Sequence, residues 1–234
     1  MRGRKKTAYA ARMPLRDLLR ERASLQAIRD HLDGLAPEVR TFEANSLKPR
    51  EQAQLFELAG EGPPIRLSHF VPDEIGIKRA VHHPGFNTVP TFPYFKHFQK
   101  RFMKPEEPSN SGKLGGYNAS NAWFIRPGYF VAYETDGAHT PGEKRAEWSR
   151  RGGVVIDYFL VPEGWATPDG WPKVVPNSVG LQRLVYHQTR DFMRGVSKHV
   201  SIGKAATEDK KGDRELDYWF TLVREEPRPT ALLR

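Results

Sequence analysis

The sequence of 234 residues contains no cysteine. Disulfide bonds, thiolate zinc sites, iron–sulfur clusters and cysteine nucleophiles are therefore excluded. Long apolar runs are also missing, since none approaches the roughly 18 to 20 residues that are needed to span a bilayer. The basic N-terminus lacks the apolar core of a secretory signal. We therefore expect a cytoplasmic protein that does not cross a membrane.

Sequence motifs for cofactors and nucleophiles are missing as well. Neither G-x-G-x-x-G nor G-x-S-x-G is present, so neither dinucleotide binding nor serine hydrolysis is favoured. Residues 111–113 (Ser-Gly-Lys) resemble the end of a phosphate-binding loop, but Glu107 and Leu114 replace two of its required residues. His82 and His83 are adjacent, a spacing that makes two rings diverge. The sequence therefore predicts no metal site, and the cofactor is unknown.

Positive charge is in excess, because 37 Lys and Arg residues against 28 Asp and Glu give a formal net charge of +9. The first sixteen positions hold no acid and these basic residues: Arg2, Arg4, Lys5, Lys6, Arg12 and Arg16. Unpaired like charges repel and cannot form a core, so residues 1–13 are predicted to be a basic disordered arm. An anion-binding arm and a targeting segment are the alternatives.

Several segments have the periodicity of helices. Apolar residues recur every three or four positions over 14–33, and a second helix begins near Pro49 and ends before Gly60. The same spacing predicts a helix over 94–103, with phenylalanines on one side and lysines around them. It also predicts a long amphipathic helix over 179–200.

Strand-like apolar runs lie on both sides of that helix in the sequence, at 121–134, 152–162 and 216–225. A short strand is expected at 65–70 and a flexible loop at 106–120. The predicted fold class is α+β, in which a curved antiparallel sheet, open or closed into a small barrel, packs against one long helix. We expect a main domain at 61–226, preceded by helices at 14–60 and followed by a flexible tail at 227–234.

Three polar residues, His199, Asp157 and His187, are candidates for acid–base chemistry. His199 falls on the apolar stripe of the long helix, where desolvation lowers the pKa of a histidine. His187 and Asp191 lie four residues apart and can meet on another helix face. Asp157 interrupts an apolar strand, where a carboxylate needs a partner. An enzyme would use His199 with Asp157 or His187 if they share a cavity; a core histidine and an aspartate at the sheet rim are the structural alternatives.

Aromatic residues are frequent on the predicted strands. Because small-molecule sites are usually apolar cavities with a few polar groups, the leading hypothesis is a protein that binds an apolar or aromatic small molecule. The predicted lining residues are Trp123, Tyr129, Tyr158 and Trp219. The alternative hypothesis is binding of nucleic acid or another anionic partner. Its predicted contacts are Arg4, Lys5, Lys6, Lys96, Lys100 and Arg101.

Overall fold

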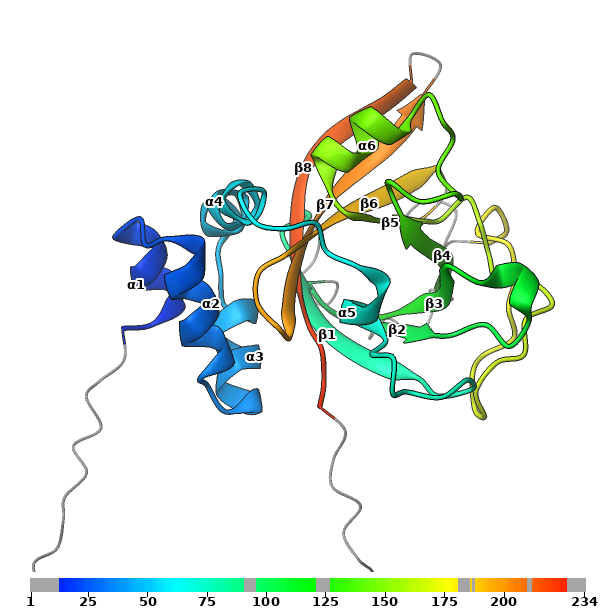
Figure 1. Cartoon of the computed structure of the whole chain (residues 1–234), viewed down its shortest axis with the longest axis horizontal. Helices are drawn as coiled ribbons and strands as arrows, with labels where there is room; N and C mark the ends of the chain where they lie inside the picture. The colour runs from blue at the N-terminus through cyan, green and yellow to red at the C-terminus, as the bar shows by residue number, and fades with distance from the viewer. Residues whose placement is uncertain are drawn as a thin grey trace, which may run out of the picture.

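Eight antiparallel strands form the centre of the molecule. A computed structural model describes residues 13–90, 96–120, 127–180, 186, 188–209 and 212–226. Each strand pairs with the next along the chain and β8 pairs with β1, so the sheet closes into a barrel (Figure 1). The strands are β1 (Val81–Asn87), β2 (His97–Met103), β3 (Lys113–Ser120), β4 (Gly128–Glu134), β5 (Val154–Asp157), β6 (Thr189–Gly195), β7 (Val200–Asp209) and β8 (Gly212–Val223).

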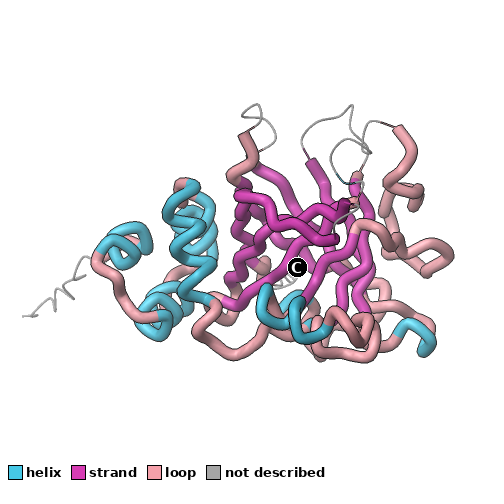
Figure 2. The backbone as a smooth tube through the Cα atoms, turned by 90° about the horizontal axis from the view of Figure 1, so that it is seen from above, coloured by secondary structure: helices cyan, strands magenta, loops and turns pink. Residues whose placement is uncertain are grey.

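Helices lie before the barrel and within its connections. The first four are α1 (Leu15–Arg20), α2 (Leu25–Asp33), α3 (Pro37–Asn45) and α4 (Pro49–Ala59). Figure 2 shows them gathered on one side of the barrel. The others are α5 (Leu67–Phe70), the 3₁₀ helix η2 (Pro108–Asn110) and α6 (Arg145–Arg151). The Ser24 hydroxyl caps α2 by accepting a hydrogen bond from the Ala27 N–H at 3.2 Å.

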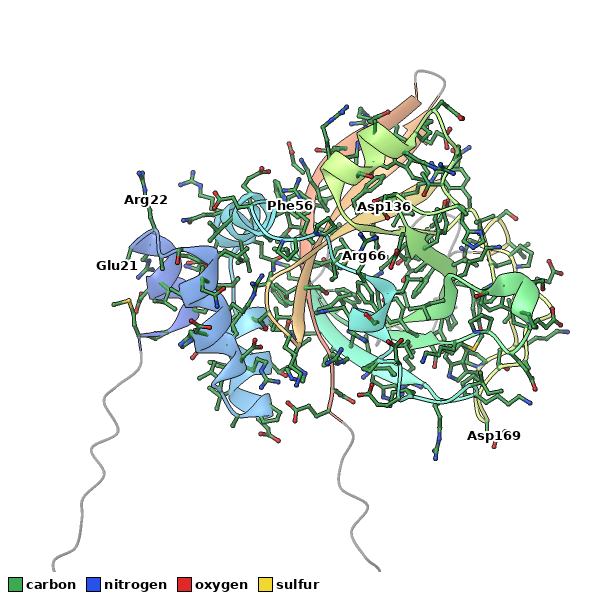
Figure 3. All side chains as sticks on the ribbon, viewed as in Figure 1. Glu21, Arg22, Phe56, Arg66, Asp136 and Asp169 are labelled. Atoms are coloured by element: carbon green, nitrogen blue, oxygen red, sulfur yellow. The ribbon has the colours of Figure 1, made fainter. Side chains whose placement is uncertain are left out.

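The barrel interior is an apolar core that α5 closes at one end (Figure 1). Successive residues of a strand point to opposite faces, and the inward set is rich in large apolar side chains. On α5, the Phe70 ring lies 4.9 Å from the Phe102 ring on β2. Arg66, just before α5, pairs with Glu134 and Asp136 at the end of β4 (Figure 3). The helix is thus attached to the barrel by both packing and charge.

The helices α1–α4 cover the outer face of β7 and β8. Their apolar residues share a second core with Val200, Ile202 and Val223 of the barrel wall. Two hydrogen bonds fix the helices beside the pairing of β1 with β8. Asn45 accepts one from the Thr221 hydroxyl at 2.8 Å, and Gln52 donates one to a β1 carbonyl at 3.3 Å.

A third core covers the outer face of β4, β5 and β6. On α6, the Trp148 ring lies 5.6 Å from the Phe192 ring of β6. Met193, the next residue, points into the barrel and is fully buried. Both faces of β6 are therefore covered by protein, and apolar residues occur on both.

This double burial explains the main error of the sequence prediction. The long helix predicted over 179–200 is wrong over 188–200, because 189–195 form β6 and the chain then turns into β7. Phe192 and Val196 are four residues apart, as on a helix face, but they belong to two different cores. Asp191 is consequently on a strand and not on a helix face.

Four further elements differ from expectation. Residues 97–103 form β2 and not a helix, since Phe98 and Phe102 are also in phase with a strand. The expected strand at 65–70 contains the short helix α5, and the expected loop at 106–120 contains β3. The single helix expected over 14–33 is divided at Arg22, whose φ is 56°.

Other parts of the prediction are confirmed. The antiparallel sheet is present and closes into a barrel, with β4 and β5 inside two of the predicted strand runs and β8 overlapping the third. The helix α4 begins at Pro49 and is followed by Gly60, as predicted.

Candidate functional site

A lysine lies inside the barrel. Lys100 occupies the middle of β2, and only 2% of its surface is exposed. Its Nζ donates hydrogen bonds to Asp191 Oδ2, at 3.0 Å, and to the Tyr158 hydroxyl. Asp191 is itself 7% exposed. We call Lys100, Asp191 and Tyr158 the interior cluster.

Strand alternation sets the direction of each charge. On β2, Lys100 points inward, whereas Arg101 points outward and donates to the Tyr117 hydroxyl at 2.8 Å. On β6, Asp191 points inward, whereas Arg190 points outward. Because β2 and β6 are four strands apart in a barrel of eight, the two inward charges meet across the interior.

Four aromatic rings surround the Lys100 ammonium. The Nζ atom lies 5.0 Å from the ring centroids of Tyr158 and Phe220, and 5.5 Å from those of Phe98 and Phe130. The negative faces of such rings attract a cation. The same rings keep the ammonium away from water, so the lysine depends on the protein for its polar contacts.

Two more polar side chains extend the cluster. The Tyr186 ring stacks on the Tyr158 ring with centroids 5.2 Å apart. The Asn118 amide on β3 donates to the Tyr186 hydroxyl at 3.2 Å. A run of hydrogen-bonding groups from β3, β6 and the connection between β5 and β6 therefore lies along one side of the interior.

Glycines on the inner wall make room for these rings. A Cβ atom added at Gly116 of β3 would overlap the Phe130 ring, and one added at Gly203 of β7 would overlap the Phe220 ring. Each ring thus lies directly on the backbone of a strand, an approach that a larger residue prevents. The rings are fixed in position around Lys100.

Burial dominates the electrostatics of the cluster. It lowers the pKa of Lys100 below its ordinary value, an effect that the Asp191 carboxylate opposes but does not cancel. Burial likewise raises the pKa of Tyr158 well above its ordinary value, and the Asp191 charge raises it further. The pKa of Tyr186 is raised for the same first reason. Both tyrosines therefore keep their protons at neutral pH.

The two ends of the interior differ in exposure. Towards α5, Phe70, Phe102 and Leu222 are fully buried. Towards the other end, Phe98 and Asn118 point inward but remain partly exposed. Phe98 and Asn118, next to the interior cluster, are therefore inward-pointing residues that remain partly accessible to solvent.

The structure does not bring the predicted acid–base residues together. Asp157 points outward near one end of β5, where it accepts hydrogen bonds from the Tyr133 hydroxyl and Arg190. His199 lies in the turn between β6 and β7, at the opposite end of the barrel wall, with Nε2 3.6 Å from Glu226. His187 lies outside the described residues.

The predicted ring residues also occupy different places. Tyr158 belongs to the interior cluster. Tyr129 points outward from β4, and its hydroxyl donates to the Pro172 carbonyl at 2.7 Å. Trp219 packs against the core of the N-terminal helices. Trp123 lies outside the described residues.

The residues predicted to bind anions are dispersed. Lys100 is inside the barrel, and Arg101 is on its outer wall. Lys96 precedes β2 and is partly buried. Arg4, Lys5 and Lys6 lie outside the described residues. The structure therefore separates Lys100 from the basic surface with which the sequence analysis grouped it.

A second charged cluster lies on the outer wall, between β6 and the tip of β8. The Arg190 guanidinium donates to Asp157 at 3.0 Å, to Glu208 at 2.7 Å and to Asp213 at 2.9 Å. Asp213 also accepts hydrogen bonds from the Lys144 ammonium and the Trp148 indole. We call Arg190, Asp157, Glu208 and Asp213 the outer cluster. Its hydrogen bonds connect four strands, β5 to β8, and α6.

Outside the barrel interior, two shallow depressions of about 240 and 260 Å³ lie on the surface. One is lined in part by Glu106 and Trp165, and the other by Met13 and His31. The described part of the chain holds no group of three acidic or histidine side chains suited to a metal ion. In that same part, every helix is too short or too polar to cross a membrane.

The fold and the interior cluster define a closed antiparallel barrel with a charge-paired lysine among aromatic rings. The sequence matches no protein-family model, and no curated protein matches it at a significant level.

Sequence reasoning did not identify Asn118, Tyr186 or the wall glycines as parts of this site. One signal was present, because Phe98, Lys100 and Phe102 alternate at a spacing of two. A lysine between two inward phenylalanines of a strand must itself point inward.

Proposed function

We propose that this protein binds a small, mostly apolar molecule inside the barrel, at the end opposite α5. The observation that supports this function most directly is the interior cluster, a buried lysine–aspartate pair enclosed by aromatic rings. A buried ion pair adds little to stability when compared with apolar residues of the same size. Its presence at the centre of an apolar core is better explained by recognition of a ligand.

The charge of the cluster restricts the ligand. Asp191 lies 3.0 Å from the Lys100 ammonium and balances its charge. The pair together offers a hydrogen-bond donor and an acceptor but no net charge. We therefore expect a neutral ligand with an aromatic or aliphatic body and one polar group, which would approach past Phe98 and Asn118.

A fluorescent probe tests this proposal. Neutral N-phenylnaphthylamine emits strongly only in apolar surroundings, so its titration against the protein reports binding to an apolar site. The Asn118→Phe variant places a ring at the partly exposed end of the interior and should weaken probe binding at least tenfold, which is about 1.4 kcal/mol.

A matched control uses the next residue. Ala119→Phe puts the same ring on the outer face of β3, and its affinity for the probe should stay within about twofold of the unmodified protein. Circular dichroism checks that both variants are folded. Failure of the unmodified protein to bind the probe, or equal weakening in the two variants, would overturn the proposal.

A further inference from the structure

The Lys100 side chain combines three properties of an amine nucleophile. It is enclosed by rings, a carboxylate oxygen lies 3.0 Å from its Nζ, and the Tyr158 hydroxyl is bonded to the same atom. Burial favours the neutral amine over the ammonium. A neutral lysine beside an acid and a base is suited to attack a carbonyl carbon.

Other described lysines lack this combination. The Lys104 ammonium donates to three backbone carbonyls, among them those of Pro72 and Ile75. Lys144 is paired with Asp213 on the outer wall, and Lys204 with Glu215. None of these three is enclosed by the barrel, so Lys100 is distinguished by its surroundings and not by its residue type.

We infer that Lys100 forms a covalent imine with an aldehyde or ketone that enters the barrel. This inference rests on the proposed function, because the carbonyl compound must first bind at the same site. It deepens that proposal by naming the polar group of the ligand, which is a carbonyl on an apolar body.

The reaction can be written with all its protons. Asp191 takes one proton from the Lys100 ammonium and leaves a neutral amine. The nitrogen lone pair forms the C–N bond while the C=O π pair moves to oxygen. That oxygen takes the Tyr158 hydroxyl proton, and the tyrosine regains one from the positively charged nitrogen. The product is a carbinolamine.

Loss of water completes the imine. Asp191 returns its proton to the carbinolamine hydroxyl, which leaves as water while the nitrogen lone pair forms the C=N bond. The product is a protonated imine beside the Asp191 carboxylate. One water molecule is released, and no atom is oxidised or reduced.

Reductive trapping tests the inference. Naphthaldehyde is added to the intact protein with cyanoborohydride, which reduces an imine to a stable secondary amine, and peptide mass spectrometry locates the modified lysines. Labelling of Lys100 should exceed that of any other lysine at least tenfold. Lys100→Met should lose this adduct, whereas Lys204→Met should retain it.

Tyr158→Phe provides a second variant that removes only the hydroxyl. It should slow trapping on Lys100 at least tenfold at a naphthaldehyde concentration that saturates the site, where weaker binding cannot account for a slower rate. Binding of naphthylmethanol, an alcohol that cannot form an imine, shows whether each variant is saturated. Naphthylmethanol binding is measured by displacement of N-phenylnaphthylamine. Equal trapping rates in Tyr158→Phe and in the unmodified protein would overturn the assigned role of the hydroxyl.

Displacement of the probe by naphthylmethanol also distinguishes the proposal of ligand binding from the proposal of imine formation. If naphthylmethanol displaces the probe but naphthaldehyde leaves no adduct on Lys100, the covalent step is wrong and the binding function stands. If neither compound displaces the probe and no adduct forms, both proposals fail.

Discussion

Arg190 and Asp191 are neighbours on one strand, yet their side chains enter opposite environments. Arg190 points outward and is bonded to three carboxylates that come from β5, β7 and β8. Asp191 points inward and is bonded to a single lysine among aromatic rings. The outer cluster connects elements of the wall, whereas the interior cluster connects β2 to β6 across the barrel interior.

The difference teaches that burial of a charge does not by itself indicate function. In the outer cluster, the hydrogen bonds of the guanidinium account for its position, because each joins parts of the wall. In the interior cluster, an apolar pair of similar volume would fill the same space. Four predictions test this contrast.

The largest effect is expected from Arg190→Met. Asp157 and Asp213 have side chains that are 3% and 1% exposed, and they would lose a shared cation. The variant should be destabilised by about 5 kcal/mol, the upper end for a broken buried pair. Urea denaturation measures this loss. Lys144→Met, which removes a more exposed partner of Asp213, should cost less, and equal losses would contradict the central position given to Arg190.

The second prediction concerns the interior pair. Lys100→Met should cost about 3 kcal/mol because it leaves the Asp191 carboxylate unpaired in an apolar core. The double variant Lys100→Met/Asp191→Leu should regain most of this loss in the same denaturation measurement. A double variant less stable than the single one would show that the pair stabilises the fold, and the contrast between the clusters would disappear.

The third prediction concerns how the free energy of unfolding depends on pH, through two histidines at the end of the barrel that α5 closes. Burial lowers the pKa of His83 to about 3 and that of His69 well below its ordinary value. The unfolded chain therefore binds more protons than the folded protein below about pH 6.5, so stability is complete above that pH and falls as the solution is acidified.

The expected slope is up to about 1.4 kcal/mol per pH unit for each histidine. Urea denaturation at a series of pH values measures it. His83→Gln can still donate to the Phe70 carbonyl and should show a smaller slope. An unchanged slope in that variant would assign the acid sensitivity to other groups.

The smallest effect is expected from Arg66→Ala. Arg66 pairs with Glu134 and Asp136, but its side chain is 47% exposed, so water screens these charges (Figure 3). The loss should be below about 1 kcal/mol by thermal denaturation. A loss as large as that of Lys100→Met would mean that α5 depends on this ion pair more than on the packing of Phe70.

The sequence allowed the strands with a simple apolar pattern to be predicted. The predicted runs contain β4 and β5 and most of β8, and α4 lies between Pro49 and Gly60 as predicted. β2 and β6 were not recognised, because Lys100 and Asp191 interrupt their inward apolar sets. The residues that make the candidate site are thus the same ones that obscured its strands.

Other features depended on distant contacts. Gly116 lies in the segment predicted to be a flexible loop, and its place on the barrel wall depends on the Phe130 ring that lies on it. Asp157 was expected to need a partner, and its cationic partner Arg190 is on a strand where the sequence predicts a helix. Pairing across the barrel cannot be inferred from local spacing when the strand itself is not identified.

The pairing of β1 with β8 covers three residue pairs, fewer than any other pairing in the described part of the barrel. Phe86 and Thr221, opposed at this seam, are 135 residues apart in the chain. Contacts so distant in sequence are slow to form, so we expect the seam to close last during folding. Asn45 and Gln52 hold both of its edges. The helices α3 and α4, which precede the barrel in the chain, would therefore already be formed when β8 pairs with β1, and their side chains would stabilise that last pairing.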